Sequence, residues 1–334
     1  MKKISISRFG GPEVLDVVDV PTPTPGPFEV RVRAHAIGVG WPDVHVRTGT
    51  YPWMHLFPMP ATPGVEMSGT VEEIGANVTR FKVGQPVYVS SALLGMAGSC
   101  YVESLLVPED LLLALPPEMS LDIAGNLAYY ALALGMLKEC GRGQRIQWVL
   151  VSGASGGVGT ALVQVAVALG YKVIATVGHE SKRQHSLGAG ANEVLDYRDE
   201  RLAQQIMSIT GGLGVDLWLE SYVGQNFSNA LECMAPWGKI VLYNAVGGHP
   251  PASFFDAWRM HIAKCLSIQY FSAHVWERDP APIRELTAQT IELLASGKIK
   301  PPSGTVFALS QVADAHRLLE SGQHVGRIFL RPDN

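Results

Sequence analysis

One stretch of this 334-residue sequence constrains the fold more than any other, because no charged side chain occurs between Ile146 and Tyr171. An apolar run of about 20 residues is long enough to cross a bilayer as a helix. Four glycines interrupt this run, however, and each costs a helix interior about 1 kcal/mol and leaves backbone groups exposed. We therefore predict a buried strand, a tight turn and a buried helix, and no membrane span. The four are Gly153, Gly156, Gly157 and Gly159.

The glycine-rich turn has the pattern at which proteins bind the pyrophosphate of a dinucleotide. It follows an apolar strand at 148–151 and opens a helix with apolar residues on one face. Glycine lets phosphates approach the N–H groups of the helix N-terminus, where the helix dipole favours negative charge. The fingerprint is incomplete, since Ala154 stands where its first glycine is usual. A turn that serves packing alone is the alternative. The predicted cofactor-binding residues are Ala154, Ser155, Gly156, Gly157, Val158 and Gly159.

The end of the next predicted strand bears on which nicotinamide cofactor is bound. Gly178 ends this strand, and Glu180, Lys182 and Arg183 follow it. A carboxylate here would bind the ribose 2′-hydroxyl of NAD, whereas two adjacent cations offer a site for the 2′-phosphate of NADP. We predict NADP(H). An ordinary solvated helix start is the alternative.

The chain is long enough for two domains. Short strands separated by Gly and Pro dominate the first ~115 residues, which indicates a small barrel-like β domain. From Gln147 onward, strands alternate with helical segments, which predicts a doubly wound parallel sheet. The predicted strands are 148–151, 173–177, 193–195, 216–219, 239–243 and 266–271, and the predicted helices are 182–187, 199–210 and 226–234. Helices at 282–294 and 313–319 and a strand at 328–330 are predicted to return to the first domain.

Charge and cysteine usage exclude several partners. The net charge is −4, and no run of basic residues exceeds two, which argues against nucleic-acid binding. Polar residues follow Lys2 and Lys3 where a signal peptide needs an apolar core. The cysteines lie far apart and form no CxxC pattern, so we predict reduced thiols and a cytoplasmic location. They are Cys100, Cys140, Cys233 and Cys265.

Several motifs occur in a characteristic order along the chain: RTGTYP at 47–52, PGVEMSG at 63–69, ASGGVG at 154–159 with Gln164, SGKIKP at 296–301 and GRI at 326–328. Together they resemble the zinc-free quinone oxidoreductase (zeta-crystallin-like) branch of the medium-chain dehydrogenase/reductase superfamily. The resemblance implies an α/β fold in which a GroES-like β-barrel domain (1–120 with 268–334) accompanies a Rossmann domain (121–267). It also implies NADPH and a homodimer.

The resemblance also assigns residues around the cofactor. Gly178, Lys182 and Tyr197 match positions around the adenosine 2′-phosphate. Val223 and Asn244 replace glycines that are usual after the fourth and fifth strands, so we expect altered contacts to the nicotinamide ribose. The predicted cofactor-binding residues of these two loops are Ser221, Asn244 and Ala245.

Two zinc ligands of related enzymes are missing. Gly40 and Val65 stand where zinc-dependent relatives carry a Cys and a His, and neither offers a side-chain donor. We predict no metal, and we interpret the adjacent Glu66 as structural.

The resemblance favours a reductase that transfers a hydride to a quinone or an α,β-unsaturated carbonyl. Tyr51 and His45 are the candidate proton donors, and for each a packing or surface role is the alternative. Gly40, Trp41 and Ala128 are expected to line the acceptor pocket, although relatives commonly carry Asn and Thr where this chain has Gly40 and Ala128. Tyr51, Trp53 and Phe57 add further aromatic bulk near Trp41. Because of these departures, a non-catalytic, crystallin-like NADPH-binding protein is the competing hypothesis.

Overall fold

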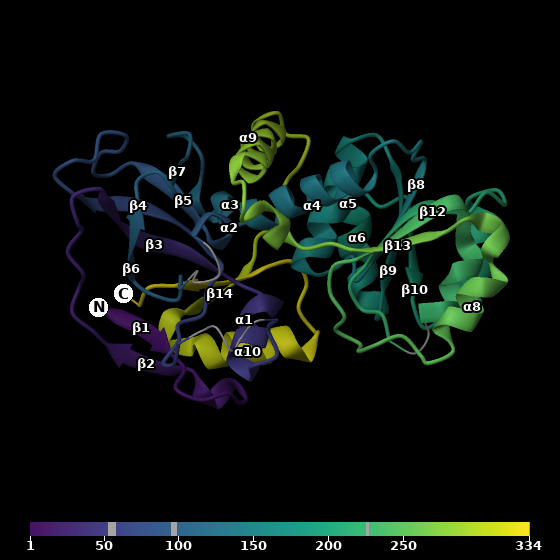
Figure 1. Ribbon diagram of the computed structural model, residues 1–334, viewed down its shortest axis with the longest axis horizontal. Coiled ribbons are helices and arrows are strands. Elements are labelled where there is room, and N and C mark those ends of the chain that lie inside the picture. The colour runs from purple at the N-terminus through teal and green to yellow at the C-terminus, as the bar shows by residue number, and fades with distance from the viewer. Residues whose placement is uncertain (53–57, 95–98, 225–226, 334) are drawn as a thin grey trace. The chain divides into compact units, whose positions relative to one another are not determined.

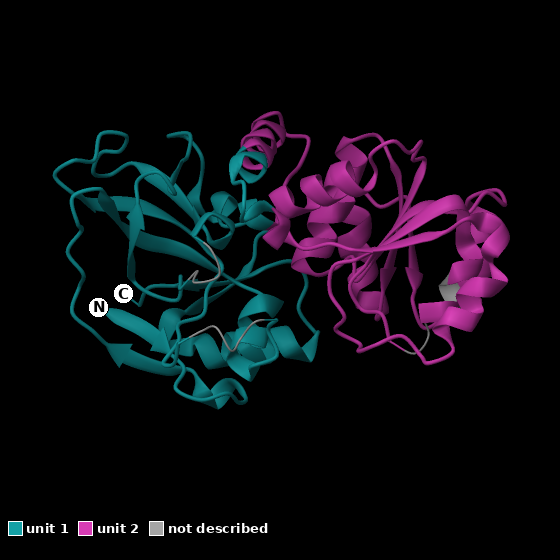
Figure 2. Ribbon diagram, in the orientation of Figure 1, with its two compact units in different colours: residues 1–128, 276–284, 302–334 teal, residues 129–275, 285–301 magenta. Residues whose placement is uncertain are grey.

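The chain forms two compact units, each of which collects segments distant in sequence. The computed structural model describes residues 1–52, 58–94, 99–224 and 227–333 (Figure 1). Unit 1 comprises residues 1–128, 276–284 and 302–334, and unit 2 comprises residues 129–275 and 285–301 (Figure 2). Unit 1 therefore contains both ends of the chain. These boundaries differ from the predicted domain limits at 120 and 267, which stay a prediction.

Unit 2 is built on a parallel sheet with the strand order β10-β9-β8-β11-β12-β13. This is the order of the doubly wound dinucleotide-binding fold, whose two halves meet between its first and fourth strands, here β8 and β11. Figure 1 shows α5 and α6 on one side of these strands and α8 on the other. The strands are β8 (Trp148–Ser152), β9 (Lys172–Val177), β10 (Glu193–Asp196), β11 (Val215–Glu220), β12 (Met234–Leu242) and β13 (Ser267–Tyr270).

The register aligns the carboxyl ends of the central strands. Val151 of β8 lies opposite Ala175 of β9 and Leu219 of β11, so the residues that follow these strands emerge at one edge of the sheet. All five residues of β8 are buried, as expected of a parallel strand covered on both faces.

The helices of unit 2 lie largely between these strands in the sequence. Helix α5 packs against β8 and β9 and buries Ala161, Leu162, Val165 and Ala166 of its predicted apolar face. It also buries Val163, which lies outside that face. The helical elements are α4 (Leu127–Cys140, which starts in unit 1), α5 (Gly157–Ala168), η3 (Glu180–Lys182), α6 (Arg183–Gly188), α7 (Leu202–Ile209), η4 (Phe227–Cys233), α8 (Phe254–Met260) and η5 (Ile262–Lys264). The segment predicted as helix 226–234 forms the tighter 3-10 helix η4 over its described residues.

Unit 1 contains a mostly antiparallel sheet with the order β14-β15-β3-β4-β5-β7, to which β6 adds by pairing with β3. The first chain segment supplies most of it, and the last segment supplies β14 and β15. Strands β1 (Lys2–Ser5) and β2 (Asp16–Asp19) form a separate two-stranded sheet. The strands of the larger sheet are β3 (Glu29–Val39), β4 (Glu66–Ile74), β5 (Pro86–Ser90), β6 (Ser104–Pro108), β7 (Leu113–Ala114), β14 (Thr305–Ala308) and β15 (Ile328–Arg331).

Short helices complete unit 1. Helix α10 packs against β14 and β15, and it buries Val312, Ala315 and Leu319. The helical elements are η1 (Pro12–Val14), α1 (Trp41–Thr48), α2 (Ser91–Leu94), α3 (Leu121–Ala124), η7 (Leu309–Gln311) and α10 (Val312–Ser321), while η6 (Ala273–Trp276) and α9 (Ala281–Ala295) are shared with unit 2.

The predicted fold class is confirmed: a parallel Rossmann-type sheet accompanies a separate β domain built from both chain ends. Among the described residues, no helix is both long and apolar enough to cross a membrane.

Candidate functional site

The glycine-rich turn connects β8 to α5 in the predicted manner. After Ser152 the chain enters the left-handed region at Gly153 (φ +63°) and starts α5 at Gly157, with Gly156 as its N-cap. The N–H of Ala154 donates to Thr176 O at 3.1 Å and so ties the turn to β9. The first N–H groups of α5 have no partner within the helix itself, which is the usual state of a helix start.

Two glycines of this turn have different physical reasons to be glycine. A Cβ on Gly159 would lie 2.2 Å from Gly153 O and 2.7 Å from Ala154 Cα, so this glycine lets the helix pack against the turn. A Cβ on Gly156 would meet only Gly153 O, at 3.5 Å. The protein therefore leaves open the space above Gly156, at the helix start that suits a pyrophosphate.

Thr160 and His185 form a contact that the sequence analysis missed. The Thr160 hydroxyl lies 2.9 Å from His185 Nε2 and donates to Ala154 O at 3.4 Å. Burial lowers the pKa of His185, which favours a neutral imidazole beside the turn. The sequence feature that could have indicated this contact is Thr160 itself, which lies in the first turn of α5, one residue after the last glycine.

The predicted 2′-phosphate corner lies where β9 ends. The Tyr197 ring lies so close to Gly178 that a Cβ at position 178 would sit 2.7 Å from Tyr197 Cε1. Lys182 ends the 3-10 helix η3 that follows, and burial lowers the pKa of its ammonium. Arg183 donates to Val194 O, so the second cation of the predicted pair is bound to strand β10. A second aromatic residue that the sequence analysis missed, Tyr222, lies with its ring centroid 5.4 Å from that of Tyr197.

The loops after β11 and β12 lie beside the glycine-rich turn. A Cβ on Gly153 would be 3.1 Å from Ser221 Oγ, which places the Ser221 hydroxyl against the turn. The N–H of Val246 donates to Ser221 O at 3.1 Å and joins the two loops. Asn244 Oδ1 accepts the N–H of Ala245 at 2.8 Å. The structure thus brings the predicted residues of both loops to the edge of the sheet where the turn lies.

Two of the predicted acceptor residues, Gly40 and Trp41, lie at the start of α1 in unit 1, whereas Ala128 lies in the first turn of α4. The N–H of Gly40 donates to Asp43 Oδ2 at 2.9 Å, and the N–H of Gly64 donates to Asp43 Oδ1 at 2.8 Å. Asp43 is fully buried, and its burial raises the pKa of the carboxyl to about 7. Asp43 was not among the predicted site residues, although Pro42 followed by an acid is typical of a helix start.

His45 and Tyr51 are close neighbours. The N–H of Tyr51 donates to His45 O at 3.1 Å, and His45 Nδ1 lies 2.9 Å from Thr50 Oγ1. The ring of Trp41 has its centroid 6.0 Å from that of His45. Burial, followed by the charges of Glu277 and Asp43, raises the pKa of Tyr51 to about 12. Two of the other predicted aromatics, Trp53 and Phe57, lie outside the described residues.

The Glu66 carboxylate binds neighbouring groups in the interior of the protein. It is fully buried and ion-paired with Arg327, and it accepts the Tyr88 hydroxyl at 2.5 Å. The N–H of Ala128 also donates to its carboxylate, at 3.2 Å. These contacts support the interpretation of Glu66 as structural. Within the described ranges, no group of three or more His, Cys, Asp or Glu side chains converges as a metal site would require.

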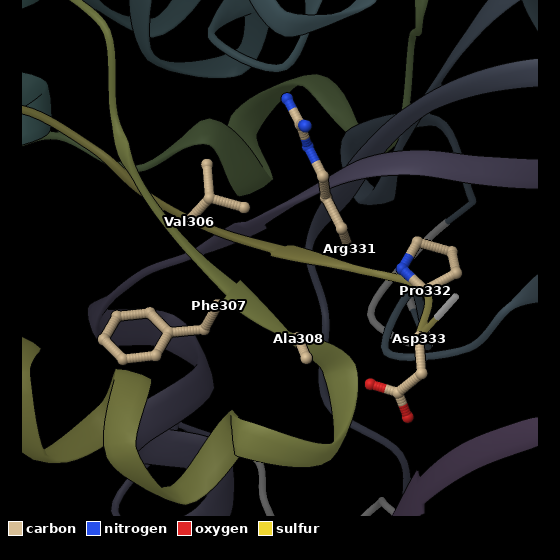
Figure 3. A pocket seen from close by; sticks show the side chains of 6 residues that line it. All are labelled: Val306, Phe307, Ala308, Arg331, Pro332 and Asp333. Atoms are coloured by element: carbon tan, nitrogen blue, oxygen red, sulfur yellow. The ribbon is translucent and has the colours of Figure 1, made fainter.

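A hollow of about 310 Å³ lies elsewhere in unit 1, where β14 pairs with β15. In Figure 3 the Arg331 and Asp333 side chains on its rim point in opposite directions. Asp333 is bound by Lys2 at 2.5 Å and by the Ser310 hydroxyl at 2.8 Å. No predicted site residue lines this hollow, so it is not the candidate site. Its lining residues are Val306, Phe307, Ala308, Arg331, Pro332 and Asp333.

A doubly wound sheet with a glycine-rich cradle at the carboxyl ends of its central strands is the arrangement of a dinucleotide-binding domain. The zinc-binding dehydrogenase family model matches residues 157–280, and that of the alcohol dehydrogenase GroES-like domain matches residues 26–117. Quinone oxidoreductase of Sus scrofa is 31% identical over 99% of this chain and 97% of its own length.

Solved structures agree with these matches. Escherichia coli quinone oxidoreductase, complexed with NADPH, superimposes with a TM-score of 0.87 at 28% identity and covers 99% of this chain and 100% of its own. A mycobacterial protein complexed with NADPH gives a TM-score of 0.87 at 32% identity, with coverage of 99% and 100%. The chain belongs to the quinone oxidoreductase branch of the medium-chain dehydrogenase/reductase superfamily, and it is an oxidoreductase. The predicted family, fold class and enzyme class are confirmed, whereas the roles of individual site residues stay predictions.

Proposed function

We propose that this protein is an NADPH-dependent, zinc-free reductase that transfers a hydride to a quinone or to an α,β-unsaturated carbonyl compound. The observation that carries the proposal is the open space above Gly156, at the start of a helix that Gly159 allows to pack against the turn. The chain's own residues would hold the cofactor as follows. The N–H groups at the start of α5 bind the pyrophosphate, Lys182 and Tyr197 bind at the 2′-phosphate, and Ser221 and Ala245 contact the nicotinamide half.

Lys182 is expected to decide between the two nicotinamide cofactors. Replacing Lys182 by alanine should raise the Kd for NADPH about 10- to 100-fold, because a hydrogen bond to a charged group is worth about 1.5–3 kcal/mol. The Kd for NADH should change less than threefold, since NADH has no 2′-phosphate. Lys172, at the opposite end of β9, is the matched control, and K172A should leave both constants unchanged. Fluorescence titration of both cofactors measures the effect. Tighter binding of NADH than of NADPH by the unaltered protein would contradict the assignment.

Reduction of the acceptor needs a proton as well as a hydride. Bound NADPH supplies the hydride. The enolate or hydroquinone anion left on the acceptor then takes one proton, which Tyr51 or His45 would provide. Because its pKa is raised to about 12, Tyr51 keeps its proton across the ordinary working range of pH. Gly40, Trp41 and Ala128 would line the acceptor site, and small residues at 40 and 128 leave room for a bulky, flat acceptor.

The tyrosine hydroxyl is expected to matter more for one acceptor class than for the other. Tyr51→Phe should slow enone reduction by about 10²-fold or more, the usual contribution of general acid catalysis, because the enolate must be protonated on carbon. Quinone reduction should fall less, since the hydroquinone oxygen is protonated readily by water. In the unaltered protein, enone reduction should not decline as the pH rises through 10, the ordinary tyrosine pKa. Steady-state rates of Y51F and of the unaltered protein with one quinone and one enone test this. Wild-type rates in Y51F would remove Tyr51 from the mechanism.

A zinc-free mechanism, a homodimer and a cytoplasmic location complete the proposal. Gly40 and Val65 supply no side-chain ligand, so elemental analysis of the purified protein should find less than about 0.1 zinc per chain, well short of the single ion that a catalytic site holds.

The dimer is supported by Phe255, Met260 and Tyr270 of unit 2, whose side chains are at least two-thirds exposed. Light scattering should give a molar mass near twice 36.0 kDa.

The proposed cytoplasmic location is supported by the four cysteines, which all lie within the described residues and form no disulfide there.

A further inference from the structure

Glu220, the last residue of β11, has a carboxylate that is almost completely withdrawn from solvent. The residue is 4% exposed. Its Oε2 accepts the Ser152 hydroxyl at 2.6 Å, and Ser152 Oγ in turn accepts the indole N–H of Trp218 at 2.8 Å. Burial raises the pKa of Glu220, while the Ser152 hydroxyl and the backbone N–H groups of the following loop oppose that rise. A buried carboxylate is retained in a fold only when such donors satisfy it.

The other carboxylate oxygen binds the loop that follows β11. Glu220 Oε1 accepts the N–H of Val223 at 3.0 Å and also the N–H of Tyr222. Val223 has φ +61°, in the left-handed region that a β-branched residue rarely enters. Such a conformation costs about 1–3 kcal/mol and persists only where the surroundings impose it. The two hydrogen bonds that Glu220 accepts from the Tyr222 and Val223 N–H groups are contacts that hold Val223 in this conformation.

The position of this network in the sheet links it to the cofactor cradle. Ser152 ends β8 and directly precedes Gly153, while Glu220 ends the neighbouring strand β11. These two strands flank the point at which a doubly wound sheet changes direction, and dinucleotides cross the sheet edge there. Each half of such a sheet binds one nucleotide, so on the proposed function the first half (β8 to β10) would serve the adenosine side and the second half (β11 to β13) the nicotinamide side. Glu220 therefore joins the two halves at their boundary.

We infer that Glu220 is a positioning residue that holds the Tyr222–Val223 backbone in its left-handed turn and fixes this turn to the glycine-rich turn through Ser152. Glu220 does not contact the cofactor in this account. It acts through the backbone of the loop, which presents Ser221 beside Gly153. The identity of the ligand rests on the proposed function, whereas the effect on the loop does not.

A suppressor experiment separates this role from a general contribution to stability. Glu220→Ala should release Val223 from the left-handed region, raise the Kd for NADPH about tenfold and speed hydrogen exchange of the Tyr222 and Val223 amides about tenfold or more. Val223→Gly alone should leave exchange of the Tyr222 amide within about threefold of that in the unaltered protein, because glycine adopts positive φ without strain while Glu220 still binds the loop. The Kd of V223G for NADPH is the reference against which the double variant is compared. The double variant E220A/V223G should recover most of the lost affinity, since glycine returns to the turn without the carboxylate.

Asp216 provides the matched control. It lies on the same strand, β11, and its carboxylate also binds to β8, accepting the N–H groups of Gln147 and Trp148 at 2.8 and 2.9 Å. It stands at the opposite end of the strand from the glycine-rich turn. Asp216→Ala should therefore lower the unfolding midpoint without changing the Kd for NADPH, and V223G should not rescue it.

Each outcome decides the inference. Additive effects of E220A and V223G, or unchanged exchange of the Tyr222 and Val223 amides in E220A, would overturn it. If E220A does not fold, Glu220→Asp, whose carboxylate is one methylene shorter, is analysed in the same way and combined with V223G. If the unaltered protein does not bind NADPH, the proposed function fails, and the hydrogen-exchange comparison still decides the role of Glu220.

Discussion

Replacement of Gly156 by valine is expected to raise the Kd for NADPH by at least about 100-fold, because it displaces a pyrophosphate whose charge-assisted hydrogen bonds are worth about 1.5–3 kcal/mol each. The backbone of Gly156 is extended (φ −78°, ψ 175°), which valine adopts readily, and a Cβ there meets only one carbonyl oxygen at 3.5 Å. The protein should therefore still fold, with a loss of stability of about 1 kcal/mol from valine at a helix N-cap. Isothermal titration of NADPH together with thermal unfolding measures both quantities.

Gly159 and Gly188 supply the contrast for this result. Gly159→Ala should lower the free energy of unfolding by about 1–3 kcal/mol, because its Cβ overlaps the backbone of Gly153 and Ala154. A Cβ on Gly188, in α6, meets nothing within 4 Å, so G188A should change neither stability nor affinity appreciably. Wild-type NADPH affinity in G156V would show that the space above Gly156 does not hold the cofactor.

Replacement of Arg327 by leucine is expected to destabilise the protein by about 3–5 kcal/mol, because the Glu66 carboxylate is left buried without its counter-ion. The side chains of this pair are 3% and 0% exposed. Arg331 is the control in the same segment, since its ion pair with Asp122 is 41% and 56% exposed. R331L should cost less than about 1 kcal/mol. Urea unfolding of the three proteins gives the comparison. Equal midpoints for R327L and R331L would contradict the structural role assigned to Glu66.

The glycine-rich turn and the strands around it could be predicted from the sequence for a physical reason. Parallel strands buried on both faces appear as continuous apolar runs, and Gly153 and Gly159 stand where the backbone needs positive φ or close approach. Helix α1 was not predicted, because its alternation of apolar and polar residues carries little helical periodicity. Strand β14 was not predicted either, since two of its four residues are exposed.

The polar network of the site could not be predicted in the same way. The contact of Glu220 with Ser152 joins residues 68 positions apart, and that of His185 with Thr160 joins residues 25 apart. No local pattern encodes such partners, because they are brought together only by the pairing of distant strands and helices. Tyr197 and Ser221 were predicted as cofactor-binding residues from the resemblance to a family. Tyr222 was identified only in the structure, through the contact of its ring with that of Tyr197.

The central claim is that the chain passes a hydride from NADPH to an electron-poor acceptor, and NADPH oxidation with a panel of quinones and enones tests it most directly. We predict acceptor-dependent consumption of NADPH by the unaltered protein, at least about 100-fold slower in G156V at subsaturating NADPH, because its pyrophosphate contacts are lost. Tight binding of NADPH with no consumption across the panel would contradict the account, and it would favour a non-catalytic NADPH-binding protein instead.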